Sequence, residues 1–252
     1  MSEVLALPTA RDEEAWRYAD FDALAGFAPA RFDAWKDIVL APGETRRKCL
    51  VLDGSGPELH RIRLTVGAGA RAEMFVVNAG HDYIRVEVEV QLAESAHFEF
   101  GGVTIGGGEA TREIVTRVTH SEPGATSRQV VRGVHWGRAT GNFVGRIEVA
   151  RNAQKTDAVQ DFKGLLLERG ASANAKPELE IFADDVKCAH GASVGQLDER
   201  ARFYMAARGL PPEVANRLLV RAFIADAFTA LAASDDQEAL LSAALTALGD
   251  AA

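Results

Sequence analysis

The sequence predicts a mainly β protein with helical ends. Between about residues 50 and 194, apolar and polar residues alternate with a period of two. This alternation is typical of strands that bury one face. It is clearest in two segments, Ile62, Leu64, Val66 and Ile84, Val86, Val88, Val90. We therefore expect a β domain over 46–196, a short helical segment over 1–45 and a helical domain over 197–252.

An internal repeat refines the β prediction. A small or turn-prone residue followed by alanine recurs at intervals of 18 to 29 residues. Its copies are Gly69-Ala70, Ser95-Ala96, Gly124-Ala125, Asn152-Ala153, Gly170-Ala171 and Gly191-Ala192. Glycine and asparagine tolerate left-handed backbone angles, and alanine fits where successive corners stack. The repeat indicates a β-solenoid, although the irregular spacing leaves an antiparallel sandwich open.

Both ends of the chain show helical spacing. In 1–45, Thr9–Asp12 resembles a helix cap, and apolar residues follow to about Phe27. In 197–252, Gly209 fits a helix end, Pro211-Pro212 fits the next helix start, and Ser234–Gln237 fits the capping box of a third helix. The middle helix is predicted from residues at the three- and four-residue spacing of one helix face, which are Ala215, Leu218, Leu219, Ala222, Phe223, Asp226 and Ala227.

Composition limits the classes of function. The net charge of −8 argues against a nucleic-acid partner, since phosphate binding favours a basic surface. No apolar run approaches the ~20 residues that span a bilayer, so we expect no membrane association. The first 20 residues show no signal-peptide pattern. Cys49 and Cys188 are the only cysteines and could form one disulfide. So few cysteines fit a protein of the reducing cytoplasm better.

Cys188 and His190 form the candidate chemical site. They lie two residues apart, so on a strand both side chains leave the same face. A thiolate with an imidazole suits zinc or iron–sulfur chemistry. Plain packing beside Val186 is the alternative that the pair alone leaves open.

Other signals are weaker. Gly106–Gly108 lacks the Gly-Lys-Ser/Thr of a phosphate loop, and the histidines show no metal-binding spacing. Asp184-Asp185 is the only candidate acid/base pair of a carbohydrate-active β-helix enzyme, but adjacent strand residues face opposite ways. Arginines precede an acidic tail in the last 60 residues, which is typical of a solvated helix face.

The segment Pro177–Leu210, which contains Lys187–Gly191, closely resembles the C-terminal signature of the SufB/SufD family, the scaffold subunits of the SUF iron–sulfur cluster assembly machine. The resemblance continues through Gly141–Gly145 and Gln154–Asp157, and Glu14–Tyr18 is similar to a SufD-type N-terminus. It implies a right-handed parallel β-helix flanked by a short N-terminal helical segment and a C-terminal helical domain.

The resemblance also implies a function. SufB has a cluster-building cysteine where this chain has Gln160–Leu167, without cysteine, so the chain is SufD-like. It would be a non-catalytic scaffold that pairs with a SufB-like paralogue and binds the ATPase SufC. A transient iron–sulfur cluster would form at the SufB–SufD interface, with no cofactor held tightly by the isolated chain. His190 would be the metal and cluster-assembly residue, and Cys188 a weaker second.

The same resemblance assigns the C-terminal helices to SufC binding. Arg217 and Arg221 lie one turn apart and share a helix face, and Arg208 and Phe223 complete the expected contact set. In the absence of SufB we expect a homodimer through the last strands near Cys188. A homodimeric regulatory module is the alternative function, and the β-helix enzyme is a more distant one.

Overall fold

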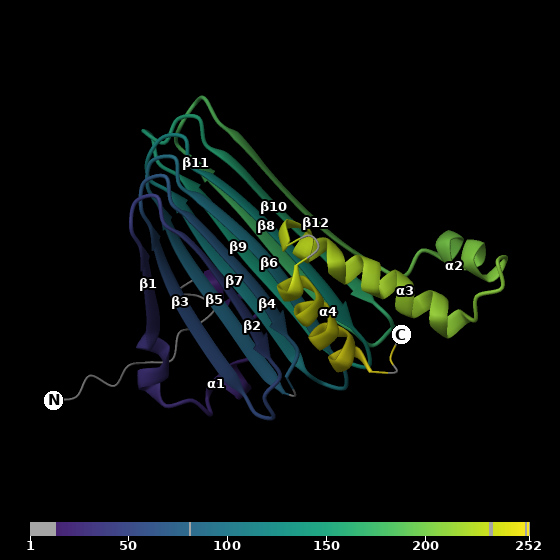
Figure 1. Ribbon diagram of the computed structural model, residues 1–252. Coiled ribbons are helices and arrows are strands. Elements are labelled where there is room, and N and C mark those ends of the chain that lie inside the picture. The colour runs from purple at the N-terminus through teal and green to yellow at the C-terminus, as the bar shows by residue number, and fades with distance from the viewer. Residues whose placement is uncertain (1–13, 81, 232–233, 250, 252) are drawn as a thin grey trace.

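The computed structural model describes residues 14–80, 82–231, 234–249 and 251. Its described strands form two parallel sheets that the chain visits alternately, one strand of each sheet per coil (Figure 1). The odd sheet contains β1 (Trp35–Leu40), β3 (Glu58–Val66), β5 (Tyr83–Leu92), β7 (Thr111–His120), β9 (Thr140–Val149) and β11 (Ser172–Ile181). The even sheet contains β2 (Thr45–Leu52), β4 (Arg71–Asn78), β6 (His97–Gly106), β8 (Thr126–His135), β10 (Asp157–Leu166) and β12 (Lys187–Gly195).

This architecture confirms the predicted β-solenoid and rules out the antiparallel sandwich. Every strand pair within the described chain is parallel. Each strand pairs with the strand two places away in the sequence, so its neighbours belong to the preceding and following coils. The backbone hydrogen bonds that hold one coil to the next therefore run the length of the solenoid.

The corner repeat is partly confirmed. Gly69, Ser95 and Gly124 have positive φ angles at the same end of successive coils. The corners are tied together, because the Gly69 N–H donates to Glu94 and the Ser95 N–H to Pro123. The alanines that follow are buried.

The remaining copies of the repeat do not form that corner. In the β9–β10 corner the left-handed residue is Lys155 rather than Asn152. Gly170 lies at the opposite end of the coil, and Gly191 lies inside β12. The repeat was defined by residue type alone, and residue type does not show at which end of a coil, or within which strand, a small residue lies.

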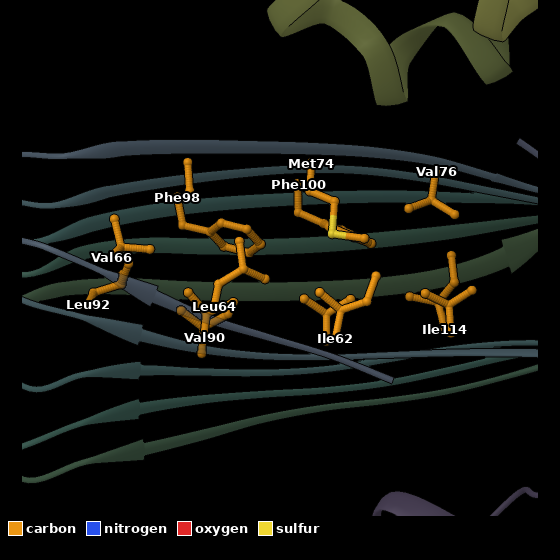
Figure 2. Packing of buried hydrophobic residues seen from close by; sticks show 14 of the residues in the cluster. Ile62, Leu64, Val66, Met74, Val76, Val90, Leu92, Phe98, Phe100 and Ile114 are labelled. Carbon is orange, nitrogen blue, oxygen red and sulfur yellow. The ribbon is translucent and has the colours of Figure 1, made fainter. Parts of the chain in front are cut away.

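The core lies between the two sheets and is built from alternate strand residues. Leucine, isoleucine, valine and phenylalanine side chains from successive coils stack in rows there (Figure 2). Phe143 and Phe162, from opposite sheets, stack at 5.4 Å with nearly parallel rings. The predicted period-two pattern thus identifies the core-facing residues of strands such as β3 and β5.

The C-terminal helices are α2 (Glu199–Ala206), α3 (Pro212–Ala225) and α4 (Asp235–Leu248), with a 3₁₀ segment Asp226–Leu231 between the last two. Figure 1 shows α3 and α4 across the outer face of the even sheet, while α2 projects beyond it. The predicted helix starts are confirmed, since α3 begins at Pro212 and the Ser234 side chain accepts the Gln237 N–H at the start of α4. Arg132, 2% exposed, joins the even sheet to this domain through Asp226, with an Nε–Oδ2 distance of 2.9 Å.

The predicted face of α3 is confirmed only in part, since Ala215 is buried and Leu219 and Phe223 are half-buried. Val220 and Ile224 are buried against the sheet, whereas Leu218 and Ala222 are exposed. The apolar residues of α3 extend around most of the helix, so spacing alone did not identify the covered face.

The N-terminal segment is also corrected in part. It contains 3₁₀ turns at Glu14–Trp16 and Pro29–Asp33 and the single-turn helix α1 (Phe21–Leu24). It also contains strand β1, although 1–45 was expected to be helical, and β2 begins at Thr45. The predicted cap at Thr9–Asp12 lies outside the described residues.

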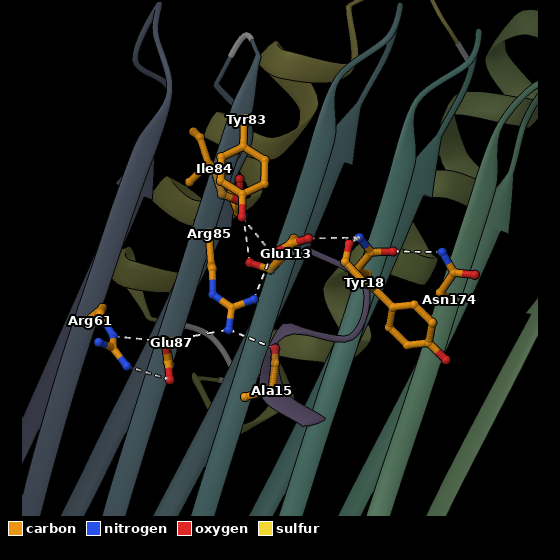
Figure 3. A network of polar contacts seen from close by, with 11 residues as sticks. Ala15, Tyr18, Arg61, Tyr83, Ile84, Arg85, Glu87, Glu113 and Asn174 are labelled. Carbon is orange, nitrogen blue, oxygen red and sulfur yellow. Dashed lines mark hydrogen bonds and ion pairs between the residues drawn. The ribbon is translucent and has the colours of Figure 1, made fainter. Parts of the chain in front are cut away.

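A buried polar network fixes this segment on the outer face of the odd sheet (Figure 3). Arg85, 1% exposed, donates to Glu113 and to the Ala15 carbonyl, each at 2.9 Å. Its guanidinium lies 3.8 Å from the centre of the Trp16 ring. Asn142 donates to the Tyr18 carbonyl at 2.9 Å. The arginine charge is therefore paired and hydrogen-bonded, as a buried charge requires.

Candidate functional site

The last coil is open at its end. Strands β11 and β12 are the terminal strands of the two sheets, so each has one edge that no described strand pairs. Side chains that face the interior of this coil are not covered by a further coil. Ile181 and Val194 are accordingly 39% and 46% exposed, and Phe182, which follows Ile181, is 57% exposed. An apolar rim of this kind, next to free strand edges, favours association with another chain.

The register places both candidate residues on the interior face of this open coil. Cys188 pairs with Ala158 of β10, and His190 pairs with Gln160. Both β10 residues are completely buried between the sheets. Parallel strands in register present paired residues on the same face, so Cys188 and His190 face the interior as well.

The two side chains differ in environment. Cys188 is half-buried and packs against a cluster that contains Val186 and Ala158. Burial, reinforced by the negative charge of Asp157, raises the pKa of its thiol. This disfavours the thiolate that metal binding needs. His190 is exposed at the open end, where its imidazole is accessible.

The pair does not amount to a complete metal site. Among the described residues, no three histidine, cysteine or carboxylate side chains gather closely enough to hold a metal ion. Structural zinc and iron–sulfur sites use four protein ligands. Further ligands would have to come from another molecule at the open end.

Two other histidines of the strands, His120 and His135, are buried. His120 ends β7, where its Nε2 lies 2.9 Å from the Ser127 hydroxyl, and His135 ends β8, at the opposite end of the coil. The solenoid does not bring them together. Burial lowers the pKa of His120 to about 4 and that of His135 to about 3, so both rings are neutral.

The segment Gly141–Gly145 supports the interior. A side chain at Gly141 would collide with the His135 ring, and one at Gly145 would collide with the Gln160 amide. Two glycines that face the interior thus make space for two buried polar side chains on the opposite sheet.

The C-terminal helices carry the second candidate surface. Arg217 and Arg221 share a face, as expected, but this face is directed toward α4 and the end of the chain. The Arg217 Nη1 donates to the Gly249 carbonyl at 3.4 Å, and Arg221 lies 3.5 Å from Glu238. Phe223 is half-buried. Arg208 is elsewhere, stacked 3.6 Å from the centre of the Tyr204 ring.

Sequence reasoning missed the apolar part of this surface. Four large side chains on α2 and α3 are exposed: Phe203 (76%), Tyr204 (58%), Val214 (46%) and Leu218 (43%). Phe203 and Tyr204 lie within Pro177–Leu210, the segment that carries the family resemblance. Their exposure follows from the position of α2 away from the sheets, which the sequence does not show.

Comparison with known proteins places these features in a family. The model of the SUF system FeS cluster assembly SufBD core domain matches residues 53–223. The iron–sulfur cluster assembly protein SufD of Escherichia coli is 38% identical over 116 residues, which cover 46% of this chain and 27% of that protein. SufD of Bacillus subtilis is 34% identical over 123 residues, covering 49% and 28%. The SufBD family protein slr0076 of Synechocystis is 33% identical over 172 residues, covering 67% and 38%.

The chain belongs to the SufB/SufD family of iron–sulfur cluster assembly proteins. The matched segments span about a quarter to two fifths of the length of these relatives. No helix among the described residues is both long and apolar enough to cross a bilayer.

Proposed function

We propose that this protein is a non-catalytic, SufD-like scaffold subunit that pairs with a SufB-like paralogue through its open last coil. The observation that carries the proposal is the exposure of His190 between two unpaired strand edges. The paralogue would cover the apolar rim and supply the missing ligands. The nascent iron–sulfur cluster is the cargo of this interface, and it would be passed on rather than retained. The protein would act in the cytoplasm, where its two thiols stay reduced.

His190 would contribute an imidazole ligand or carry a proton during cluster formation. Imidazole binds iron well and changes its protonation near neutral pH. Cys188 has the smaller role in this proposal, since its half-buried position resists ionisation.

The test is reconstitution of the complex with the cysteine-bearing paralogue and the ATPase, followed by iron and sulfide analysis. His190→Ala should assemble the complex and lose most cluster formation, because the side chain is exposed and contributes little to the fold. Cys188→Ala is the matched control two residues away and should lose less. Wild-type cluster yield in His190→Ala, with loss in Cys188→Ala, would contradict the assignment.

The same free edges support a homodimer when the paralogue is absent. Two copies can meet through the open coil around a two-fold axis, each covering the rim of the other. Light scattering of the isolated chain at micromolar concentration should give twice the monomer mass. A strict monomer would contradict this part of the proposal. If the dimer persists in the presence of the paralogue, the regulatory homodimer is the better function.

The helical domain would bind the ATPase subunit. Support comes from the exposed side chains of α2 and α3 together with Arg208, Arg217 and Arg221. The double substitution Arg217→Glu and Arg221→Glu should weaken ATPase binding in a calorimetric titration and leave the solenoid folded, since exposed charges contribute little stability. Phe203→Ser, on α2, reports separately on the apolar part. Unchanged affinity in both would show that the ATPase binds elsewhere.

A further inference from the structure

A row of buried polar side chains leads to His190 through the interior of the solenoid. Gln129 of β8 pairs with Gln160 of β10, and Gln160 pairs with His190 of β12. All three occupy the same register position in successive coils, so neighbouring members are separated by about 4.8 Å along the sheet. Both glutamines are completely buried, in a core that is otherwise mostly apolar.

The amides of this row have no assigned hydrogen bonds. In the described structure, neither the oxygen nor the nitrogen of the Gln129 and Gln160 amides has a partner, and the hydroxyl of Thr116 is in the same condition. A buried amide without partners destabilises a fold, because it gives up its hydrogen bonds to water without replacing them. The fold therefore retains two costly groups in adjacent coils.

The opposite sheet leaves space for the Gln160 amide. It lies against Gly145, where any side chain would collide with it, and Gly145 pairs with Thr116. The polar side chains next to Gln160 on its own face are Gln129 on the buried side and His190 on the open side. Glutamines stacked in register in parallel strands form ladders through their amides, and this ladder would end on the imidazole.

We infer that Gln160 is the positioning residue of His190. In the arrangement that we infer, the Gln160 amide, which forms no such bond in the described structure, turns so that its oxygen accepts the N–H of the imidazole and its NH₂ group donates to the Gln129 oxygen. One ring nitrogen of His190 is thereby held toward Gln160, and the other, with its lone pair, is directed to the open end. Histidine ligands of metals are commonly fixed in this way by a carbonyl or carboxylate oxygen. The role in assembly rests on the proposed function of His190.

The direct test is nuclear magnetic resonance of the full chain labelled with ¹⁵N on histidine. The spectrum is recorded at about pH 8.5, where the two nitrogen shifts of a neutral imidazole report its tautomer. The His190→Ala spectrum assigns the signals. The wild-type His190 ring should show one dominant tautomer, with widely separated nitrogen shifts. Equal tautomer populations in the wild type would overturn the inference without any substitution.

Two matched variants locate the effect. Gln160→Met keeps the volume and removes the acceptor, so the two His190 nitrogen shifts should move toward each other. Gln129→Met makes the same change one coil deeper and should leave the dominant tautomer in place. Both should fold, because an apolar side chain replaces an amide that has no assigned partner. Unchanged His190 shifts in Gln160→Met, or equal effects of the two variants, would overturn the inference.

The second arm is cluster formation in the reconstituted complex. Gln160→Met should reduce it by about 10-fold or more, as loss of such a supporting hydrogen bond commonly does, and Gln129→Met should reduce it less. A changed tautomer with unchanged cluster formation would overturn the functional part of the inference. If His190→Ala itself leaves cluster formation intact, the proposed function fails, while the resonance experiment still decides whether Gln160 positions the ring.

Discussion

The middle coils and the last coil of the solenoid are built on the same plan but behave differently. In the middle coils, interior residues such as Phe143 and Phe162 are covered on both sides, with exposures of 0% and 1%. In the last coil, equivalent positions face an open end, and Val194 is 46% exposed. An interior residue of a solenoid is covered most completely when a coil lies on each side of it. The closed coils therefore supply stability, and the final coil is available for binding.

The comparison also separates two kinds of polar residue. Arg85 and Glu113 are buried on the outer face, and their charges are paired in a network that holds the N-terminal segment. Gln160 is buried in the interior near the open end, and its amide has no such partner in the described structure. Satisfied polar groups strengthen a fold, whereas a buried amide without a partner needs an explanation, which for Gln160 we seek in its place next to His190.

The largest expected contrast is in packing. Phe162→Ala removes a ring stacked on Phe143 in a closed coil, and should lower the free energy of unfolding by about 3–5 kcal/mol. Val194→Ala, in the open coil, should change it by about 0.5 kcal/mol or less. Urea unfolding monitored by circular dichroism measures both values. Losses of similar size would show that the last coil is as well packed as the middle ones.

A glycine pair gives a smaller contrast. Gly141→Ala would press a methyl group into the buried His135 ring and should cost about 1–3 kcal/mol. Gly195→Ala in the last coil has no atom within 4 Å of the new methyl group, so its effect should be within about 0.5 kcal/mol. Thermal unfolding reports both. The double variant His135→Ala with Gly141→Ala should cost less than the sum of the single changes, because the collision disappears. Strict additivity would contradict the contact.

The contrast between coils was only partly predictable from the sequence. Period-two alternation identified the buried faces, since Ile62, Leu64 and Val66 all face the core. It did not reveal β1, whose residues Trp35–Leu40 are mostly exposed or half-buried at the first edge of the odd sheet. A terminal strand buries too few side chains to show a clear alternation.

The sequence predicted which residues form the candidate site, but not how exposed each of them is or which side chains surround them. The spacing of Cys188 and His190 placed them on one face, which the register confirms. Their unequal exposure depends on the coil stacked beneath them and on the absence of a described strand on the other side. Gln129 and Gln160 are separated by 31 residues, and nothing in their local sequence links them to His190. Only the strand register brings these residues into one row.

The smallest expected effect is on pH dependence and concerns the closed coils. His120 and His135 are neutral in the fold, with pKa values lowered to about 4 and about 3 by burial. In the unfolded chain they bind protons with an ordinary pKa of about 6.5, so lower pH favours unfolding. Their contribution is fully present above about pH 6.5 and is lost progressively as the pH falls toward the folded values. Between pH 7.5 and pH 6 each ring should cost about 1 kcal/mol.

His135→Leu tests this directly. The variant should lose about half of the stability change that the two rings produce between pH 7.5 and pH 6, because it removes one of the two proton-binding sites of the unfolded chain. Thr104→Val is the matched control, since Thr104 is also buried near Gly133 but does not titrate. Urea unfolding at both pH values gives the two free energies needed for each protein. A pH slope in His135→Leu as steep as that of Thr104→Val would mean that the His135 ring takes up a proton without unfolding, and that this interior is less closed to water than its packing indicates.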